Sequence, residues 1–304
     1  MYDVIIVGGG PAGMTAALYA LRNGKTALVI EKNGFGGQIT HSPKVENYPG
    51  TLQMSGNEFA ERMLEQIMAQ GADIEMENVA ALEDQGDHKT VRTEEGSAFE
   101  GRAVVLATGV EHRMLGLPGE EELVGEGISF CAVCDGDFYT GKRVCVAGGG
   151  NSALQEALLL ADKCSEVIVL QDLDRCTGEQ RLQDALFKRS NVRLVTGAAI
   201  TDLLQENGRL TGLKIRQKGT EGPRIISCEG LFVSIGLIPR NEAFAPFADL
   251  DPYGYFDADE RCLTRTPGVY AAGDCRSKTV RQLATAIADG ACAALAACRY
   301  LNEK

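Results

Sequence analysis

Short apolar runs alternate with one helical stretch in the N-terminal region. Residues 2–7 form an apolar run, residues 8–13 read GGGPAG, and residues 14–22 have the spacing of a helix. A second apolar run over residues 26–30 ends in Glu31. This order predicts a strand, a tight glycine turn, a helix and a second strand.

The same order returns in the second half of the chain. An apolar run over residues 143–147 leads to GGGNSA at 148–153, a helix that ends at about Asp162, and another apolar run over residues 167–170. An internal repeat of this kind is typical of two nucleotide-binding folds of one type.

Further elements lie between and beyond these repeats. Alternating positions over residues 72–105 and 193–226 predict a strand meander in each half. Residues 56–70 and 284–301 predict helices, and residues 36–50 form a long polar loop of a length that usually serves a site. More buried strands are expected at residues 103–109, 231–236 and 268–274.

The C-terminal segment is too short to be a domain alone, so we expect it to complete the first fold. The predicted protein is therefore of the α/β class, with two Rossmann-like domains of three ββα layers each and the second inserted in the first. The first domain is expected to comprise residues 1–112 and 242–304, and the second residues 116–238.

The candidate redox chemistry lies at the start of the second domain, in the segment CAVCDG. Cys131 and Cys134 are separated by two residues and can close a small disulfide ring, and Asp135 follows directly. The sequence leaves two alternatives for this pair. The pair can be half of a zinc site, although the sequence has no second CxxC or CxxH, or two buried structural thiols.

Composition narrows the class of partner. The chain of 304 residues has 42 acidic and 30 basic side chains, a balance that argues against nucleic acid and anionic membranes. No unbroken apolar run is long enough to span a bilayer, and a first strand starting at Tyr2 leaves no room for a signal peptide. The ten cysteines are scattered, which favours a reducing cytoplasm. No metal site is expected.

The motifs together resemble low-molecular-weight thioredoxin reductases over essentially the whole chain. The resemblance rests on GGGPAG, Glu31, a Gly-Gly-Gln segment at 36–38, VENYPG at 45–50, ATG at 107–109, CAVCDG, GGGNSA, AGD at 272–274 and Arg281-Gln282. The position of the CxxC in the second fold is specific to this branch of the flavin disulfide reductases.

The resemblance implies FAD in the first domain. Glycines of the first turn would hold the pyrophosphate at a helix N-terminus, and Glu31, 23 residues after Gly8, would accept hydrogen bonds from the ribose. The implied FAD-binding residues are Gly8, Gly10, Pro11, Ala12, Gly13, Glu31, Lys32, Gly37, Gln38, Asn47, Val79, Thr108, Gly109, Gly273, Asp274, Arg281, Gln282 and Leu283.

The resemblance also implies a reaction and partners. The Cys131–Cys134 disulfide would take electrons from the flavin, one thiol would attack the disulfide of thioredoxin, and the other would resolve the mixed disulfide. Asp135 would act as the nearby acid and base, or, alternatively, is a helix cap or a solvated acid. A homodimer is implied.

The second domain departs from the family at its nicotinamide site. Where the family has His-Arg-Arg and a further Arg for the 2′-phosphate of NADPH, this chain has Gln171, Asp172, Leu173 and Thr177. Loss of several charge-assisted bonds, each worth about 1.5–3 kcal/mol, removes most of the preference for NADPH. NAD(P)H is therefore a doubtful ligand, although the intact glycine turn keeps nicotinamide binding open.

This departure is similar to the ferredoxin-linked flavin thioredoxin reductases. We therefore expect reduced ferredoxin as the electron donor, ahead of NADH and then NADPH; because ferredoxins are acidic, a local basic patch would be needed. Two other classes stay open: a flavin dithiol oxidase acting on a small dithiol, and a redox-responsive FAD-binding protein without enzyme activity.

Overall fold

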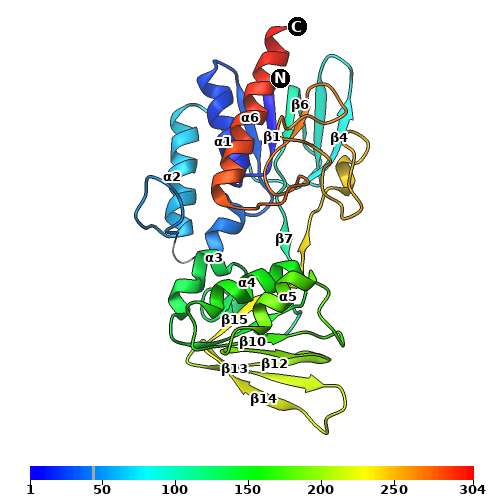
Figure 1. Ribbon diagram of the computed structural model, residues 1–304. Coiled ribbons are helices and arrows are strands. Elements are labelled where there is room, and N and C mark those ends of the chain that lie inside the picture. Colours follow the sequence, from blue (N-terminus) through cyan, green and yellow to red (C-terminus); the bar gives the residue numbers. More distant parts are fainter. Residues whose placement is uncertain (43–44) are drawn as a thin grey trace. The chain divides into compact units, whose positions relative to one another are not determined.

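A computed structural model describes residues 1–42 and 45–304 (Figure 1). The chain divides into two compact units. Unit 1 consists of Met1–Glu111 and Ile238–Lys304, and unit 2 consists of His112–Leu237. Since unit 1 contains both ends of the chain, unit 2 is an insertion in it.

Unit 1 is built on a parallel sheet in which β1 lies between β2 and β6. Strand β3 extends the sheet beyond β2, and β17 pairs with β6 from the C-terminal segment. The strands are β1 (Tyr2–Val7), β2 (Ala27–Ile30), β3 (Asp73–Glu75), β6 (Ala98–Leu106) and β17 (Val269–Ala271).

The long strand β6 belongs to two layers. Its C-terminal half pairs with β1 and β17, whereas its first residues pair antiparallel with β5, which in turn pairs with β4. The two meander strands are β4 (Val79–Asp84) and β5 (Lys89–Thr93). The meander therefore forms the second β layer of the unit.

Helices cover the opposite face of the parallel sheet (Figure 1). They are α1 (Pro11–Arg22), α2 (Gly56–Ala69) and α6 (Leu283–Asn302), with the short 3-10 helices η1 (Gly37–His41) and η4 (Glu242–Phe244) in loops. Alternate residues of β1 explain the layering: Val4 and Ile6 face the helices, whereas Ile5 and Val7 face the meander.

Unit 2 repeats this plan. Its parallel sheet has the order β11-β10-β9-β15-β8, its meander is β12-β13-β14, and α4 and α5 pack on the other face of the sheet. The strands are β8 (Ile128–Ser129), β9 (Arg143–Ala147), β10 (Glu166–Leu170), β11 (Val192–Val195), β12 (Ala198–Glu206), β13 (Arg209–Gln217), β14 (Arg224–Ser227) and β15 (Gly230–Val233). The helices are η2 (Glu121–Leu123), α3 (Ala132–Asp135), η3 (Gly136–Tyr139), α4 (Asn151–Ala161) and α5 (Gln180–Phe187).

The chain passes between the units twice, through β7 (Glu111–His112) and β16 (Leu237–Ile238), which pair with each other. Both connections are short. The α/β architecture with two ββα units predicted from the sequence is confirmed by these layers.

The structure corrects several predicted elements. The predicted meanders 72–105 and 193–226 were too broad, because β3 and β11 instead extend the parallel sheets beside β2 and β10. Helix α1 begins at Pro11, whose fixed φ suits a first helical turn. Helix α5 was not foreseen, and the expected loop 36–50 contains η1, with Pro43 and Lys44 outside the described residues.

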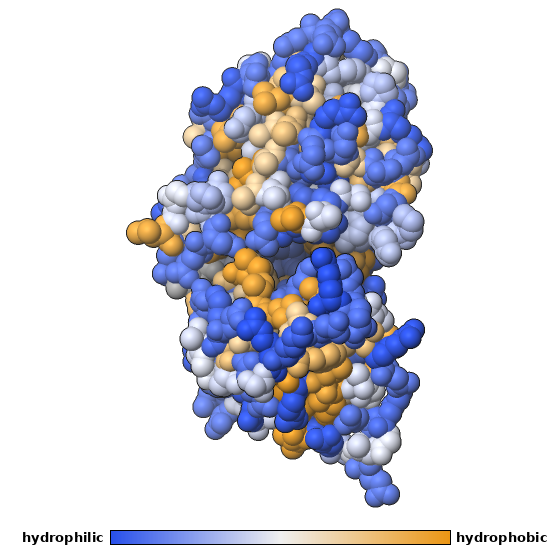
Figure 2. Space-filling model, viewed as in Figure 1, coloured by the Kyte–Doolittle hydropathy of each residue, from blue (hydrophilic) through white to orange (hydrophobic). Residues whose placement is uncertain are grey.

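Figure 2 shows that polar residues predominate on the visible face of each unit, with small apolar groups between them. Within the described residues, no helix is long and apolar enough to cross a membrane.

Candidate nucleotide site and redox disulfide

The turn after β1 has room for backbone only. Gly8 has φ +109°, and a Cβ there would stand 2.2 Å from the carbonyl oxygen of Ala107. A Cβ on Gly13 would stand 1.9 Å from the carbonyl oxygen of Gly8. The turn therefore requires glycine at both positions, and it delivers the chain into α1 with Gly10 as an N-cap that has no side-chain bond. Free N–H groups at such a terminus suit a phosphate.

Glu31 lies next to this turn. Its Oε2 accepts a hydrogen bond from the N–H of Gly9 at 2.7 Å, and its Oε1 accepts one from the N–H of Asn33 at 2.9 Å. The carboxylate that follows β2 is thus fixed beside the glycine turn, as the spacing in the sequence predicts. Lys32, expected to contact the cofactor, pairs with Glu111 at 2.9 Å.

Two glycines from distant segments also approach the start of α1. The Cα of Gly10 would be 3.5 Å from a Cβ on Gly37, the first residue of η1. A Cβ on Gly273, after β17, would be 2.8 Å from the Cβ of Ala12. The structure therefore brings the predicted Gly-Gly-Gln and Ala-Gly-Asp segments to the same helix terminus, and Gln38 follows within η1.

Asp274 of unit 1 has an unsatisfied hydrogen-bond acceptor. Its Oδ1 is buried and has no hydrogen-bond partner among the described residues. Burial raises the pKa of this carboxyl to about 6, against the pull of Lys278 and Arg281. An unpartnered buried acceptor costs free energy, so a hydroxyl donor is expected here.

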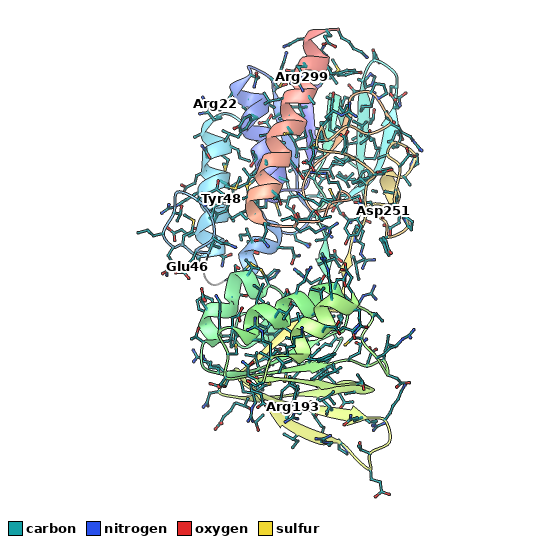
Figure 3. All side chains as sticks on the ribbon, viewed as in Figure 1. Arg22, Glu46, Tyr48, Arg193, Asp251 and Arg299 are labelled. Carbon is teal, nitrogen blue, oxygen red and sulfur yellow. A yellow bond between two sulfur atoms is a disulfide. The ribbon has the colours of Figure 1, made fainter. Side chains whose placement is uncertain are left out.

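Arg281 supports the same turn. Its Nε donates to the carbonyl oxygen of Asp274 at 3.2 Å, and its guanidinium lies 4.1 Å from the centroid of the Tyr255 ring. That ring is held by a turn at Asp251, labelled in Figure 3, whose Oδ1 accepts from the N–H of Tyr255 at 3.0 Å.

The loop before α2 meets the start of α6. Nδ2 of Asn47 donates to Oε1 of Gln282 at 3.3 Å, and Tyr48, labelled in Figure 3, meets Phe59 of α2 edge-on at 5.0 Å. Gln282 caps α6 in a capping box with Thr285, and Leu283 begins the helix. Asn47 and Gln282, far apart in sequence, are therefore neighbours.

The remaining predicted residues are less informative. Thr108 donates from Oγ1 to Oδ1 of Asn241 at 2.8 Å, and Gly109 follows with φ +66°. Asn241 is fully buried and also donates to the carbonyl oxygens of Gly254 and Cys275. Val79 begins β4 and pairs with Thr93, so its part in binding stays a prediction.

These features fit FAD. A turn without room for side chains and an uncapped helix terminus suit a pyrophosphate, and a buried orphan acceptor at Asp274 suits a hydroxyl of the cofactor.

In unit 2, Cys131 and Cys134 form a disulfide with their Cα atoms 5.3 Å apart. Cys131 is the N-cap of α3, and the N–H of Cys134 donates back to its sulfur at 3.1 Å. Between them, the side chain of Val133 is exposed. In the described part of the chain, no group of three or more His, Cys, Asp or Glu side chains suited to a metal occurs.

Asp135 lies partly buried behind the disulfide. Its Oδ2 accepts from the hydroxyl of Ser129 at 2.6 Å, and that hydroxyl accepts from the N–H of Cys131 at 3.1 Å. The other oxygen, Oδ1, is buried without a partner among the described residues. Burial raises the pKa of Asp135, so the carboxyl is suited to hold and release a proton.

A second carboxyl stands in the same unit. Glu156 of α4 accepts a hydrogen bond from the hydroxyl of Ser234, which follows β15. Burial raises the pKa of Glu156 to about 7, while hydrogen bonds from Ser234 and the backbone of Ala132 lower it. Glu156 was not predicted as a site residue, although a glutamate at core-facing spacing between buried Ala153 and Leu160 is a signal in the sequence.

The second glycine turn keeps the backbone of the first. Gly148 has φ +121°, and a Cβ there would be 2.4 Å from the carbonyl oxygen of Ser234. Gly150 caps α4 without a side-chain bond. Gln171, which is buried, lies against Gly149 and donates from Nε2 to the carbonyl oxygen of Arg175 at 3.3 Å.

The segment after β10 has mixed charge. Asp174 pairs with Lys218 at 2.9 Å, and both Asp172 and Leu173 are exposed. The N–H of Thr177 donates to the carbonyl oxygen of Gly149 at 2.8 Å. No cluster of cations occupies the four positions that differ from the NADPH pattern.

The family model for pyridine nucleotide-disulphide oxidoreductases matches residues 2–290. The chain belongs to this family. Its relatives include thioredoxin reductases: that of Listeria monocytogenes is 38% identical over 303 residues, covering 100% of this chain and 95% of its own.

Two other comparisons extend this result. The solved thioredoxin reductase of Streptococcus pyogenes has a TM-score of 0.94 and 35% identity, covering 100% of this chain and 99% of its own. A Clostridium pasteurianum relative, described as a 34.2 kDa protein in a rubredoxin operon, is 37% identical, covering 99% of this chain and 98% of its own. The chain is thus an oxidoreductase of the low-molecular-weight thioredoxin reductase type.

Proposed function

We propose that this oxidoreductase is an FAD-dependent thioredoxin reductase that uses the Cys131–Cys134 disulfide. The observation that carries the proposal is this disulfide with the partly buried Asp135 directly behind it. Bound FAD supplies a carrier that accepts electrons from a donor and passes them to a disulfide. The thioredoxin reductase relatives support thioredoxin as the substrate.

The residues of the chain divide the work. Glycines at 8, 13, 37 and 273 let their segments approach closely around the start of α1, where a pyrophosphate would bind, and Glu31 and Asp274 offer carboxylate acceptors to hydroxyl groups. In unit 2, the reduced pair attacks the substrate disulfide through one thiolate, and the second sulfur resolves the mixed disulfide. Asp135 protonates the leaving sulfur.

Replacement of each cysteine separately tests this assignment. Cys131→Ser and Cys134→Ser should each abolish reduction of thioredoxin, measured as new thiols by a thiol reagent, and should leave the flavin absorbance of the purified protein intact. Wild-type turnover in either variant would contradict the proposal. The same assay with a small dithiol and oxygen tests the dithiol oxidase, which the relatives do not favour.

We further propose reduced ferredoxin, rather than NADPH, as the electron donor. A 2′-phosphate carries nearly two negative charges, and Asp172 would repel it at a position where the family has a basic residue. The acidic net charge of −12 weighs against an acidic partner unless its docking surface is locally basic.

NADH is the second candidate, because the turn at Gly148 and the uncapped start of α4 match those of unit 1. Supplying NADPH, NADH and reduced ferredoxin in turn, with thioredoxin as acceptor, ranks the donors. Turnover with NADPH at low micromolar concentration would reverse the proposed order. We also propose that the protein is a cytoplasmic homodimer. Sedimentation of the purified protein tests the dimer, and fractionation of cells tests the location.

A further inference from the structure

Glu156 has a partly buried carboxyl that takes no part in the proposed reduction of thioredoxin. It lies in the second turn of α4, on the face where Ala153, Ala157 and Leu160 are fully buried. An acid at such a position costs free energy unless hydrogen bonds compensate. Those bonds come from the hydroxyl of Ser234 and the backbone of Ala132.

These two partners connect Glu156 to the redox site. Ala132 lies between the two cysteines, at the first position of α3. Ser234 is fixed at the end of the sheet, since its N–H donates to the carbonyl oxygen of Ala147 at 2.9 Å. Because α3, which carries the disulfide, packs against α4, a change of charge at the disulfide occurs near a carboxyl that the hydroxyl of Ser234 holds in place.

Few charged side chains lie close enough to Glu156 to affect its pKa. Asp135 of α3 is the charged group that acts on it, and its negative charge raises the pKa of Glu156 further after burial has done so. The charged side chains of the other elements around α4 are either paired with each other or exposed. They are Arg143 paired with Glu166 on β9 and β10, Lys163 paired with Asp137 beside η3, and exposed Arg181 and Asp184 on α5.

Resting on the proposed redox role of this disulfide, we propose that Glu156 is a positioning residue that takes up a proton when the Cys131–Cys134 bond is reduced. Two electrons break the sulfur–sulfur bond, and two protons enter from solvent. One proton bonds to a sulfur and the other to the carboxylate of Glu156, so that the second sulfur stays a thiolate.

The reverse step balances in the same way. The thiolate attacks the disulfide of thioredoxin, the Cys131–Cys134 bond forms again, and the two electrons leave in the two thioredoxin sulfurs. The proton on Glu156 and the proton on the remaining cysteine leave as well, and Asp135 relays one of them to the leaving sulfur, so that thioredoxin gains two thiols. Neutral Glu156 removes the repulsion between two negative charges in a poorly solvated site while the thiolate exists.

Equilibration of the flavin-loaded protein with dithiothreitol buffers tests this coupling. The fraction of Cys131 and Cys134 that reacts with an alkylating reagent gives the equilibrium constant, and its pH dependence gives the number of protons bound on reduction. Between about pH 6 and about pH 8.5, wild type should show an inflection near the point where Glu156 titrates. Glu156→Gln should lose this inflection. Above the pH of the inflection, the equilibrium constant of the variant should therefore differ from that of wild type by a further factor of about ten for each pH unit.

Two further variants separate a proton role from a structural one. Ser234→Ala removes a bond that lowers the pKa of Glu156, so the inflection should move to higher pH. Asp184→Asn removes an exposed carboxylate from α5 and should leave it unchanged. A wild-type inflection in Glu156→Gln overturns the inference, whereas failure of dithiothreitol to open the disulfide in wild type overturns the proposed function instead.

Discussion

Glu31 accepts a hydrogen bond from the N–H of Gly9 at 2.7 Å, which joins the end of β2 to the first glycine turn. In unit 2 the matching position is Gln171, whose side chain lies against Gly149. The two turns therefore share their backbone but differ in the charge beside them. A neutral amide is a weaker acceptor for a ribose hydroxyl than a carboxylate is, and it binds a phosphate less strongly than an arginine does.

This difference predicts that NADPH use can be introduced. The variant that combines Gln171→His, Asp172→Arg, Leu173→Arg and Thr177→Arg restores the basic pattern of the family. Two new charge-assisted bonds of about 1.5 kcal/mol each would lower the KM for NADPH by about 100-fold. Steady-state reduction of thioredoxin at varied NADPH concentration measures the change.

NADH is the internal control for this variant, because it lacks the 2′-phosphate. Its KM should change by less than about threefold. An equal gain with both nucleotides would mean that the new cations act by general attraction and not by binding the phosphate.

Asp274 predicts opposite effects of one substitution on stability and on FAD binding. Its folded pKa of about 6 lies above the ordinary value of 3.8, so the cofactor-free protein loses stability as the pH rises from about 4 to about 6. Asp274→Asn should remove this loss, worth up to about 3 kcal/mol, and make the cofactor-free protein more stable at pH 7. Urea unfolding at several pH values measures it.

The same variant should bind FAD more weakly, by about 10-fold to about 100-fold, because a neutral amide is a poorer acceptor for a hydroxyl. Fluorescence titration with FAD measures this affinity. Exposed Asp172→Asn, a control in unit 2, should change neither quantity. Equal FAD affinity in Asp274→Asn and wild type would show that the orphaned oxygen does not face the cofactor.

The glycine turns and the cysteine pair could be predicted because their geometry is local. Gly13 faces the carbonyl oxygen of Gly8 five residues earlier, and Cys131 and Cys134 are joined by a single helical turn. The pairing of β3 with β2 and of β11 with β10 could not be predicted, since the sequence of a short strand does not specify which strand lies beside it.

Buried polar groups were missed for a related reason. In sequence, Glu156 and Asp289 look like ordinary polar residues of a helix, and only the tertiary structure supplies Ser234 to the first and Arg276 with Lys278 to the second. Helix α5 was missed because its exposed residues hide a narrow apolar stripe.

Asp289 predicts a large loss of stability on neutralisation. This buried carboxylate of α6 accepts from Arg276 and Lys278 at 2.8 Å each and from the N–H of Gly273 at 3.0 Å. Asp289→Asn would leave two buried cations undercompensated, at a cost of about 3–5 kcal/mol at pH 7. Urea unfolding of the cofactor-free protein measures the difference.

The pH dependence distinguishes this mechanism from a packing defect. Burial alone would raise the pKa of Asp289, but the bonds from Arg276 and Lys278 together hold it below 3.8. A lowered acid contributes stability above its unfolded pKa and loses it as the pH falls through the folded value. The gap between wild type and Asp289→Asn should therefore narrow below about pH 4. A constant gap down to acid pH would indicate lost packing.

Gly290 predicts how closely α6 must approach α1. A Cβ there would stand 2.1 Å from the carbonyl oxygen of Ala12, although alanine is favoured over glycine inside a helix by about 1 kcal/mol. Because backbone cannot yield as a side chain can, the overpacking cost of about 1–3 kcal/mol should win, and Gly290→Ala should both destabilise unit 1 and weaken FAD binding beside Ala12. Gly34→Ala, with nothing within 4 Å, is the matched control and should be neutral in urea unfolding and FAD titration. A more stable Gly290→Ala would mean that helix propensity outweighs this contact and that the two helices can separate without loss.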